Sequence, residues 1–375
     1  MIKATPDPTA GLAHGMAAMA ITPKPAAKPP AAAAPEVKFG LHFLKVVKGV
    51  HEDDIHCIAR LTDGTFVTGS KDGALKKWNL NGELVRVIDD PALIDYTKWV
   101  TALARFNDTH WICGKRDGTA ILWNNEGTAF TQLNTQHAPF PKGGAPLCKQ
   151  RNVHRINCLA SFEQWTKKPL FFAGWATQFT LHDAHSQKRL RYTYTSNNDW
   201  VYAIQPLAHD SLLVVTGCRL DLWNLRPGTF DWEWKDELIV EDKSLKQRPY
   251  ISAITPLQEN AGKYGVAVFD GSVRIYDLTV KKEIFKGQEH INRVWTVENI
   301  APHCFASCGD DGFVKLWDLR LTPKSTVSLK GNIYEKSRVS VLLRINDNQL
   351  MGASCPDNVK YSQTKAQFTY WDIRR

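Results

Sequence analysis

The fold is decided by a stretch near the C-terminus, residues 304–320, which reads CFASCGDDGFVKLWDLR. An apolar run is followed by an Asp-Gly pair and by a segment in which apolar and polar residues alternate up to a Trp. An Asp-Gly pair between two such runs is typical of a tight β-hairpin turn. Similar stretches stand at residues 66–80, FVTGSKDGALKKWNL, and 111–125, WICGKRDGTAILWNN. The turn Asp precedes the Trp by six residues each time, so the chain contains an internal repeat.

The repeat extends over most of the chain. A fourth copy at residues 266–278 keeps the spacing from Asp270 to Tyr276, and weaker copies lie at 171–183, at 213–225 and around Trp371. Upstream of each copy lies another short strand, and the first apolar residues of these strands are Ile55, Val100, Ile156, Val201, Ile251, Val294 and Val339. Four short antiparallel strands in each unit are typical of a propeller blade. The sequence therefore predicts an all-β fold, a seven-bladed β-propeller of four-stranded antiparallel blades.

The two ends of the repeat region are expected to meet. The seventh unit stops at its third strand, whereas residues 37–48, VKFGLHFLKVVK, have strand character but no unit of their own. We expect this segment to supply the missing strand, because pairing the chain ends in one blade removes a free sheet edge. Residues 37–375 are thus predicted to form one domain.

Residues 1–36 have a different composition, with 12 Ala, 7 Pro and no aromatic residue. Such a segment cannot bury enough apolar surface to offset chain entropy, which predicts a disordered tail. Its apolar stretch, residues 11–21, ends near an A-x-A pattern, but it contains His14 and two Gly and is poor in Leu, so we do not expect an export signal. No apolar run reaches the roughly 20 residues that cross a bilayer. We expect a cytoplasmic protein, with the nucleus as the alternative.

The repeat resembles the WD-repeat β-propeller family over nearly the whole chain after the tail. That family often carries a hydrogen-bonded tetrad of His, Ser or Thr, Asp and Trp in a blade. The resemblance implies two such structural tetrads here, which are His51, Thr68, Asp72 and Trp78 in the first unit and His290, Ser307, Asp311 and Trp317 in the sixth. The second, third, fourth, fifth and seventh units lack the His, so their assignment rests on pattern and order.

Motifs that carry chemistry are absent from the sequence. There is no G-x-S-x-G elbow, no H-E-x-x-H, no Gly-rich phosphate loop and no paired-cysteine zinc pattern. The eight cysteines include no C-x-x-C pair, and most sit inside apolar runs, which favours buried thiols in a reducing compartment. A His beside an Asp inside a blade is better explained by a satisfied polar network than by catalysis. We expect no enzyme, no cofactor and no metal.

A candidate binding surface follows from the residue that precedes each first apolar position. We call these seven positions the mouth ring, because the fold should gather them around the central opening. Its members are Asp54, Trp99, Arg155, Trp200, Tyr250, Arg293 and Arg338. Aromatic residues and Arg are enriched at interface hot spots. We predict that the last six of these residues bind a partner together with Lys71 and Arg116. The same face should carry the insertions at residues 137–155 and 355–367. The alternative role for these residues is packing at the junctions between blades.

Three functions remain open. The first is a non-catalytic scaffold that binds one or more proteins or peptides of acidic character, monomeric alone and part of a complex. The second is a substrate receptor of a cullin-type ubiquitin ligase, which the W-D-x-R residues Trp317, Asp318, Arg320, Trp371, Asp372 and Arg374 would dock on its adaptor. The third is a nucleic-acid or anionic-lipid binder, suggested by a net charge of +9 and by basic runs such as residues 188–191. Runs this short are usually solvated, so we expect neither nucleic-acid binding nor membrane insertion.

Overall fold

The structure is a computed structural model of the 375-residue chain. It describes residues 40–89, 99–133, 135, 154–162, 168–195, 199–207, 211–225, 232–239, 249–257, 262–320, 327–330, 337–355 and 365–373. The chain divides into two units, Met1–Lys38 and Phe39–Arg375. The tail expected over residues 1–36 lies outside the described residues.

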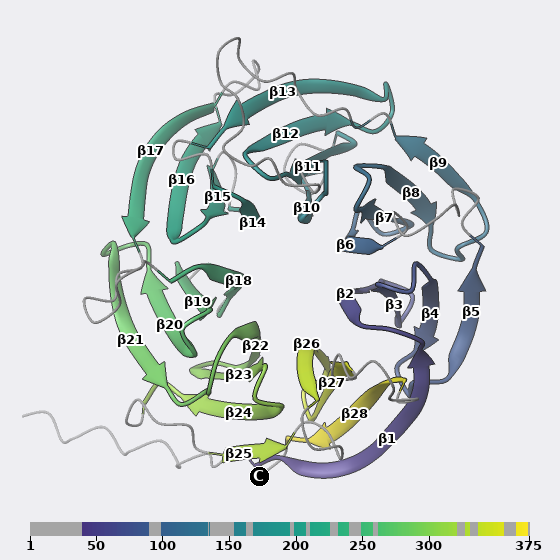
Figure 1. Cartoon of the computed structure of the whole chain (residues 1–375). Helices are drawn as coiled ribbons and strands as arrows, with labels where there is room; N and C mark the ends of the chain where they lie inside the picture. The colour runs from purple at the N-terminus through teal and green to yellow at the C-terminus, as the bar shows by residue number, and fades with distance from the viewer. Residues whose placement is uncertain are drawn as a thin grey trace, which may run out of the picture. The chain divides into compact units, whose positions relative to one another are not determined.

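The second unit is a ring of seven four-stranded antiparallel sheets around a central opening (Figure 1). The fold class predicted from the sequence is confirmed. Blade 1 contains β2 (Ile55–Arg60), β3 (Thr65–Ser70), β4 (Leu75–Asn79) and β5 (Leu84–Ile88). Blade 2 contains β6 (Val100–Arg105), β7 (His110–Lys115), β8 (Ala120–Asn124) and β9 (Phe130–Leu133). Blade 3 contains β10 (Cys158–Ser161), β11 (Leu170–Gly174), β12 (Gln178–Asp183) and β13 (Lys188–Tyr194).

The remaining blades follow in chain order. Blade 4 contains β14 (Val201–Pro206), β15 (Ser211–Thr216), β16 (Arg219–Leu225) and β17 (Trp232–Ile239). Blade 5 contains β18 (Ile251–Pro256), β19 (Lys263–Val268), β20 (Ser272–Asp277) and β21 (Lys282–Gln288). Blade 6 contains β22 (Val294–Ala301), β23 (Cys304–Gly309), β24 (Phe313–Asp318) and β25 (Val327–Lys330). Blade 7 contains β26 (Arg338–Asn346), β27 (Gln349–Cys355), β28 (Ala366–Asp372) and β1 (His42–His51).

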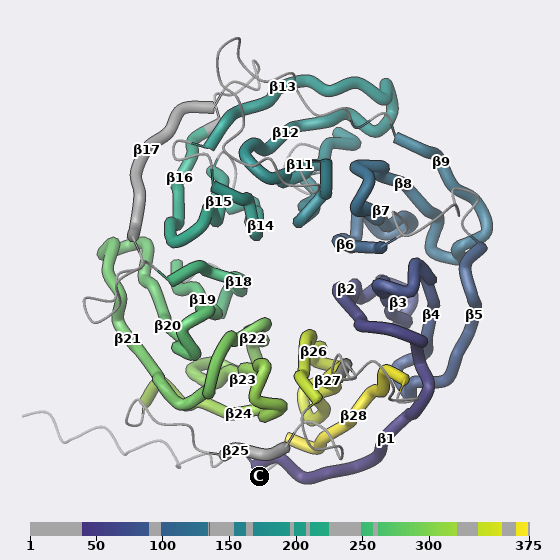
Figure 2. Tube along the Cα trace, viewed as in Figure 1, coloured from purple at the N-terminus to yellow at the C-terminus, as the bar shows by residue number. Residues whose placement is uncertain are grey.

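Blade 7 closes the ring with strands from both ends of the chain. The N-terminal strand β1 pairs antiparallel with β28, and Figure 2 shows the purple β1 along the yellow β28. The closure was predicted for residues 37–48, but the strand runs from His42 to His51, so the His of the first tetrad is its last residue. A second difference lies in blade 3, where Ile156 is fully buried but β10 begins only at Cys158.

The Asp-Gly turns give the second and third strands of a blade their tight connection. Gly73, Gly118, Gly271 and Gly312 have φ values of 86°, 92°, 84° and 74°, a region that favours Gly because it has no Cβ. The third strand then returns with its apolar side chains facing the neighbouring blade, and all seven first-strand apolar residues predicted from the sequence are 0% exposed. The core of the propeller is therefore a series of blade-to-blade clusters.

Neighbouring blades approach each other most closely near the inner strands. A Cβ on Gly69 of β3 would lie 2.3 Å from Cγ1 of Val100 in blade 2, and one on Gly114 of β7 would lie 2.7 Å from Cγ2 of Ile156 in blade 3. Only Gly fits there. In the part of the chain that the structure describes, no helix combines the length and the apolar character that a membrane crossing requires.

Candidate functional site at the mouth of the central channel

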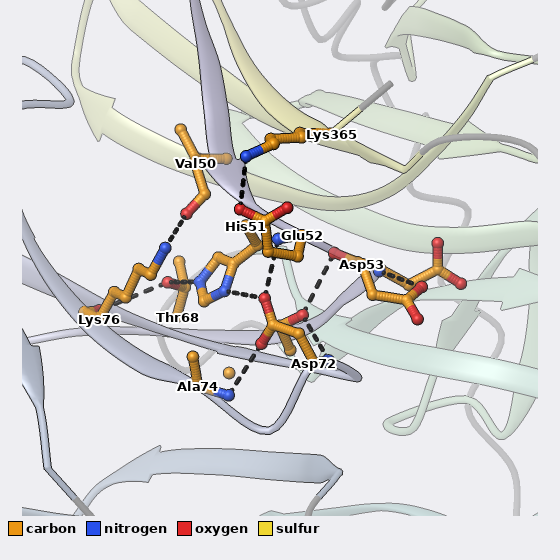
Figure 3. A network of polar contacts seen from close by, with 12 residues as sticks. Val50, His51, Glu52, Asp53, Thr68, Asp72, Ala74, Lys76 and Lys365 are labelled. Carbon is orange, nitrogen blue, oxygen red and sulfur yellow. Dashed lines mark hydrogen bonds and ion pairs between the residues drawn. The ribbon is translucent and has the colours of Figure 1, made fainter. Parts of the chain in front are cut away.

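The first tetrad is one hydrogen-bonded chain that links the end of β1 in blade 7 to blade 1, and Figure 3 shows three of its members, His51, Thr68 and Asp72. Trp78 Nε1 donates to Thr68 Oγ1 over 2.8 Å, and Thr68 Oγ1 lies 2.7 Å from Nε2 of His51. The other ring nitrogen, Nδ1, lies 3.0 Å from Oδ2 of Asp72. These partners suit a neutral His51 that carries its proton on Nδ1.

The Asp of this tetrad also holds the turn. Its carboxylate accepts hydrogen bonds from the backbone N–H groups of Glu52 and Ala74. Burial opposes ionisation, but these hydrogen bonds and the one from His51 lower the pKa of Asp72 to about 2. Burial lowers the pKa of His51. The geometry is thus a satisfied structural network and leaves no side chain poised to act on a ligand.

The sixth unit repeats the same arrangement. His290 Nδ1 lies 2.9 Å from Oδ2 of Asp311, and its Nε2 lies 2.7 Å from Oγ of Ser307. Trp317 Nε1 donates to the same Ser hydroxyl over 2.8 Å. The structure therefore brings together both sets of four side chains.

Blade 3 contains a related network that the sequence reasoning missed. Trp175 Nε1 donates to Oγ1 of Thr180 over 2.9 Å, and Nε2 of His182 lies 2.7 Å from the same oxygen. The central hydroxyl here lies on β12, the third strand, whereas Thr68 and Ser307 lie on second strands. The presence of His182 at the repeat's Trp position was the one available signal.

The mouth ring lies on the face that also carries the turns between second and third strands. In five blades the carbonyl of the mouth-ring residue accepts a hydrogen bond from the turn that follows the second strand, as in Lys71 N to Asp54 O and Arg116 N to Trp99 O. The corresponding acceptors in blades 4, 5 and 6 are Trp200, Tyr250 and Arg293. The alternation of strand direction predicted this common face.

A cavity of about 590 Å³ opens at the centre of this face. It is lined by four mouth-ring residues, which are Arg155, Trp200, Arg293 and Arg338. Trp99, Tyr250, Lys71 and Arg116 do not line it. Lys71 Nζ and Arg116 Cζ instead lie 5.2 and 4.1 Å from the ring centroid of Trp99, so these three form a cation–π stack beside the channel.

A second ring of residues that lines the channel was missed from the sequence. Each of these residues directly follows the buried first apolar residue of its blade, and all seven line the cavity. We call them the wall ring. Its members are His56, Thr101, Asn157, Tyr202, Ser252, Trp295 and Ser340. Six of them stand at a register shift in the pairing of the first and second strands, for example between Ile55 and Cys57. Such a β-bulge leaves one residue unpaired and turns the chain locally. The repeated bulge therefore exposes one extra side chain to the channel in each of these blades.

Wall-ring hydroxyls also join blades to one another. Thr101 Oγ1 donates to the carbonyl oxygen of Ile156 over 2.6 Å, and Ser340 Oγ donates to that of Ile55 over 2.8 Å. Ser252 Oγ bonds in the same way to Val294. Each acceptor belongs to the next blade, so the small polar wall residues hold the ring together.

The large wall-ring residues form an aromatic arc with the mouth ring. Tyr202 stacks near Trp200 and contacts Tyr250 and Phe269, with centroid separations of 6.4, 6.2 and 6.0 Å. Arg293 Cζ lies 3.7 Å from the Phe269 centroid and 4.6 Å from that of Trp295. The arc thus provides flat apolar surface with embedded positive charge.

Acidic residues also contact the cations and aromatic rings of the mouth. Arg338 bonds to Asp54, and Trp295 Nε1 donates to Asp310 Oδ1 over 2.6 Å. Burial raises the pKa of Asp199. Burial also raises the pKa of Tyr202 to about 12, with help from Tyr250 and Asp199. The mouth therefore carries both positively and negatively charged side chains.

The residues of the ligase hypothesis do not form such a surface. Arg320 makes two hydrogen bonds to Asp318 of its own motif, of 2.9 and 2.5 Å, and Trp317 and Trp371 are buried in the core. Asp372 is buried at the end of β28, and Arg374 lies outside the described residues. Docking on a ligase adaptor stays a prediction.

The basic runs are separated from each other. Residues 188–191 lie on β13 and Lys281-Lys282 at the start of β21, which are outer strands of different blades (Figure 1). Most of the insertion at 137–155 and residues 356–364 of the second insertion lie outside the described residues. Within the described residues, no group of three or more His, Cys, Asp or Glu side chains could hold a metal ion.

Two segments of the chain match the family model of the WD domain, G-beta repeat, at residues 44–79 and 281–318. The first segment runs from β1 of blade 7 into blade 1 and the second from β21 of blade 5 into blade 6, and each contains one complete tetrad. A Danio rerio protein, "p21-activated protein kinase-interacting protein 1-like", is 36% identical over 76 residues, which are 20% of this chain and 21% of that protein. The Arabidopsis thaliana "Protein SPA1-RELATED 3" is 35% identical over 68 residues, 17% of this chain and 8% of that protein.

The matched segments thus span about a fifth or less of these relatives' length. The fold evidence covers more of the chain than these matches do, because the same blade recurs seven times. The chain is thus a seven-bladed β-propeller that carries WD40 repeats at two positions.

Proposed function

We propose that this protein is a non-catalytic scaffold whose channel mouth binds an extended segment of a partner protein. The observation that carries the proposal is the convergence of mouth-ring and wall-ring residues from all seven blades on one cavity of about 590 Å³. Trp, Tyr and Arg dominate the larger side chains there, and these are the residues that contribute most to protein interfaces.

The family supports the class of function. WD40 propellers generally mediate protein–protein interactions, and the name of the Danio rerio relative describes an interacting protein. The similarity covers 21% of that relative, so its partner is not transferred to this chain.

The electrostatics support a partner with acidic character. Arg155, Arg293 and Arg338 line the cavity, and Lys71 and Arg116 stand beside it. Burial lowers the pKa of Arg293 although the nearby Asp310 raises it, so desolvation outweighs that favourable charge. A partner carboxylate would offset part of the desolvation cost.

The test compares partner capture by the full-length wild type and two full-length variants. Trp200→Ala and Arg293→Ala together remove an aromatic and a cationic contact at the mouth and should reduce affinity for the captured partner at least about thirtyfold, the effect of roughly 2 kcal/mol. Arg105→Ala removes the same type of charge at the opposite end of an inner strand and should leave capture unchanged. Loss with Arg105→Ala and retention with the double variant would place the binding surface on the other face.

A further inference from the structure

Three buried polar atoms without a hydrogen-bond partner stand on neighbouring residues of the channel. Among the residues that the structure describes, Nε of Arg155, Nε2 of His56 and Nδ2 of Asn157 are shielded from solvent and lack a partner. All three residues line the central cavity. Buried polar groups are normally paired, so such a group calls for a specific explanation.

The backbone around these groups is fixed. Ile156, which separates Arg155 from Asn157, is fully buried, and its N–H donates to the carbonyl oxygen of Lys115 over 3.2 Å. The Asn157 N–H donates to the carbonyl oxygen of Gly174 over 2.8 Å. His56 is the bulged residue of β2 and packs against the Trp99 ring at a centroid distance of 5.8 Å. The unpaired polar groups are therefore held in place in the channel wall.

Within the described part of the chain, no carboxylate is paired with Arg155. Burial lowers the pKa of Arg155, and so does the positive charge of Arg116; Cys57 and Tyr202 raise it. None of these neighbours is a carboxylate. Burial, with the charges of Arg155, Arg338 and Lys71, lowers the pKa of His56 to about 3. A buried cation without a counter-ion is costly, and a bound anion would relieve the cost.

The other arginines of the cavity already have partners. Arg338 is paired with Asp54, and Arg293 lies over Phe269 and Trp295. Arg155 differs, because its buried Nε has no hydrogen-bond acceptor among the residues that the structure describes. An Arg side chain that offers Nε together with an adjacent NH group matches the two oxygens of a carboxylate.

We propose that Arg155, Asn157 and His56 form a subsite for one carboxylate, the side chain of an Asp or Glu in an extended protein segment that enters the channel. The inference rests on the proposed function and names the group that anchors the partner. Arg155 binds the carboxylate side-on, the Asn157 amide donates to the same group, and the neutral His56 ring donates through Nε2.

The surroundings favour a single carboxylate over a nucleic-acid backbone. Carboxylates of Asp53 and Asp54 stand beside the cations of the mouth, and Asp310 lies at the Trp295 indole. A chain with a phosphate at every unit would be repelled by these groups. A mostly neutral peptide with one acidic side chain meets the cationic subsite and stacks on the aromatic arc without that repulsion.

The probe is a capped pentapeptide, Ala-Ala-Glu-Ala-Ala, added to the full chain and followed through the Nε–Hε NMR resonance of Arg155. That resonance is identified by its disappearance in Arg155→Lys. The matched peptide with Gln in place of Glu tests the charge, and pentauridylate tests a polyanionic backbone. Arg86→Gln is the control variant, because Arg86 lies exposed on the outer strand β5. Melting temperatures establish that each variant is folded.

We expect the Glu peptide to move the resonance saturably and the Gln peptide to bind at least about tenfold more weakly, the effect of losing a charged hydrogen-bonded pair. Binding of the Glu peptide, followed by backbone resonances, should weaken about tenfold in Arg155→Lys, which keeps the charge but loses the fork, and should change less than about twofold in Arg86→Gln. Asn157→Asp, which adds a like charge, should weaken it as well.

Three results would overturn the subsite: equal binding of the two peptides, equal weakening by Arg86→Gln and Arg155→Lys, or a response to pentauridylate at lower concentration than to the Glu peptide. The proposed function is separable from these outcomes. It survives when the subsite fails but partner capture is still lost in the Trp200 and Arg293 double variant. The proposed function fails, while the subsite stands, when the Glu peptide binds as expected but partner capture is unchanged in that double variant.

Discussion

Asp311 is a single carboxylate that satisfies three donors. It accepts hydrogen bonds from the His290 ring and from the backbone N–H groups of Ile291 and Phe313. Burial opposes its ionisation, yet the hydrogen bond from His290 and the backbone bonds lower the pKa of Asp311 below its usual value. Its side chain is 5% exposed, so water cannot readily replace these contacts.

We therefore expect Asp311→Ala to lower the free energy of unfolding by about 1 to 3 kcal/mol, because it leaves buried donors unpaired. The measurement is urea-induced unfolding. Asp117→Ala is the matched control: Asp117 holds the same place in blade 2, where it is exposed and accepts a bond from the backbone of Thr119. Equal losses in the two variants would mean that the tetrad adds nothing to an ordinary turn.

His182 gives the fold a measurable dependence on pH. It is 2% exposed and bonded to Thr180, and burial together with Arg189 lowers its pKa to about 3. The unfolded chain takes up a proton near the ordinary pKa of about 6.5, whereas the folded chain does not. The folded state thus loses stability as pH falls below that value.

Between pH 7.5 and 5.5 the wild type should lose about 1.4 kcal/mol more stability than His182→Gln, which has no such group to titrate. Other groups titrate in this range, among them Glu298, whose pKa burial raises to about 7, so only the difference between the two proteins is diagnostic. A variant that loses as much stability as the wild type would exclude His182 as the source.

At the scale of strands, the closure of blade 7 joins the chain ends. The strand β1 pairs with β28 from His42 opposite Asp372 to His51 opposite Ala366. Lys365 Nζ adds a contact of 2.6 Å to Oε1 of Glu52, just after β1 (Figure 3). Loss of β1 would expose the edge of β28, and unpaired edges promote aggregation.

Deleting residues 1–36 should leave the melting temperature unchanged within about two degrees, because the deletion spares β1. Deleting residues 1–48 removes most of β1 and should lower the melting temperature sharply and cause aggregation, monitored by light scattering. If the two deletions melt alike, β1 does not stabilise the ring.

The sequence predicted the strands correctly wherever a residue type has a single structural role in the repeat. The Asp-Gly turn, the Trp six residues later and the buried residue at the start of each inner strand marked blade order, as Asp72, Trp78 and Ile55 illustrate. The tetrads followed from family resemblance. Tyr202, Trp295 and His56 could not be predicted as channel residues, because strict alternation places a residue after a buried one on the opposite side of a strand, whereas a bulge redirects it. Phe269 lies in a turn, where no periodicity applies.

The proposed binding surface exists only in the closed ring. Residues as distant in sequence as His56 and Ser340 line the same cavity only because seven blades close. The same closure places cations and aromatic rings on one face and leaves outer strands such as β5 and β13 at the rim (Figure 1). We propose that the channel mouth, and not the rim, contacts the partner.

Photo-crosslinking in living cells tests this claim whatever the identity of the partner. The photoreactive amino acid p-benzoylphenylalanine replaces Tyr250 at the mouth in one protein and Tyr192 on the outer strand β13 in another; the two tyrosines are 42% and 46% exposed, so access to the probe is matched. Light-dependent adducts of higher mass should form from position 250 and be absent from position 192. Adducts from position 192, with none from position 250, would contradict binding at the channel mouth.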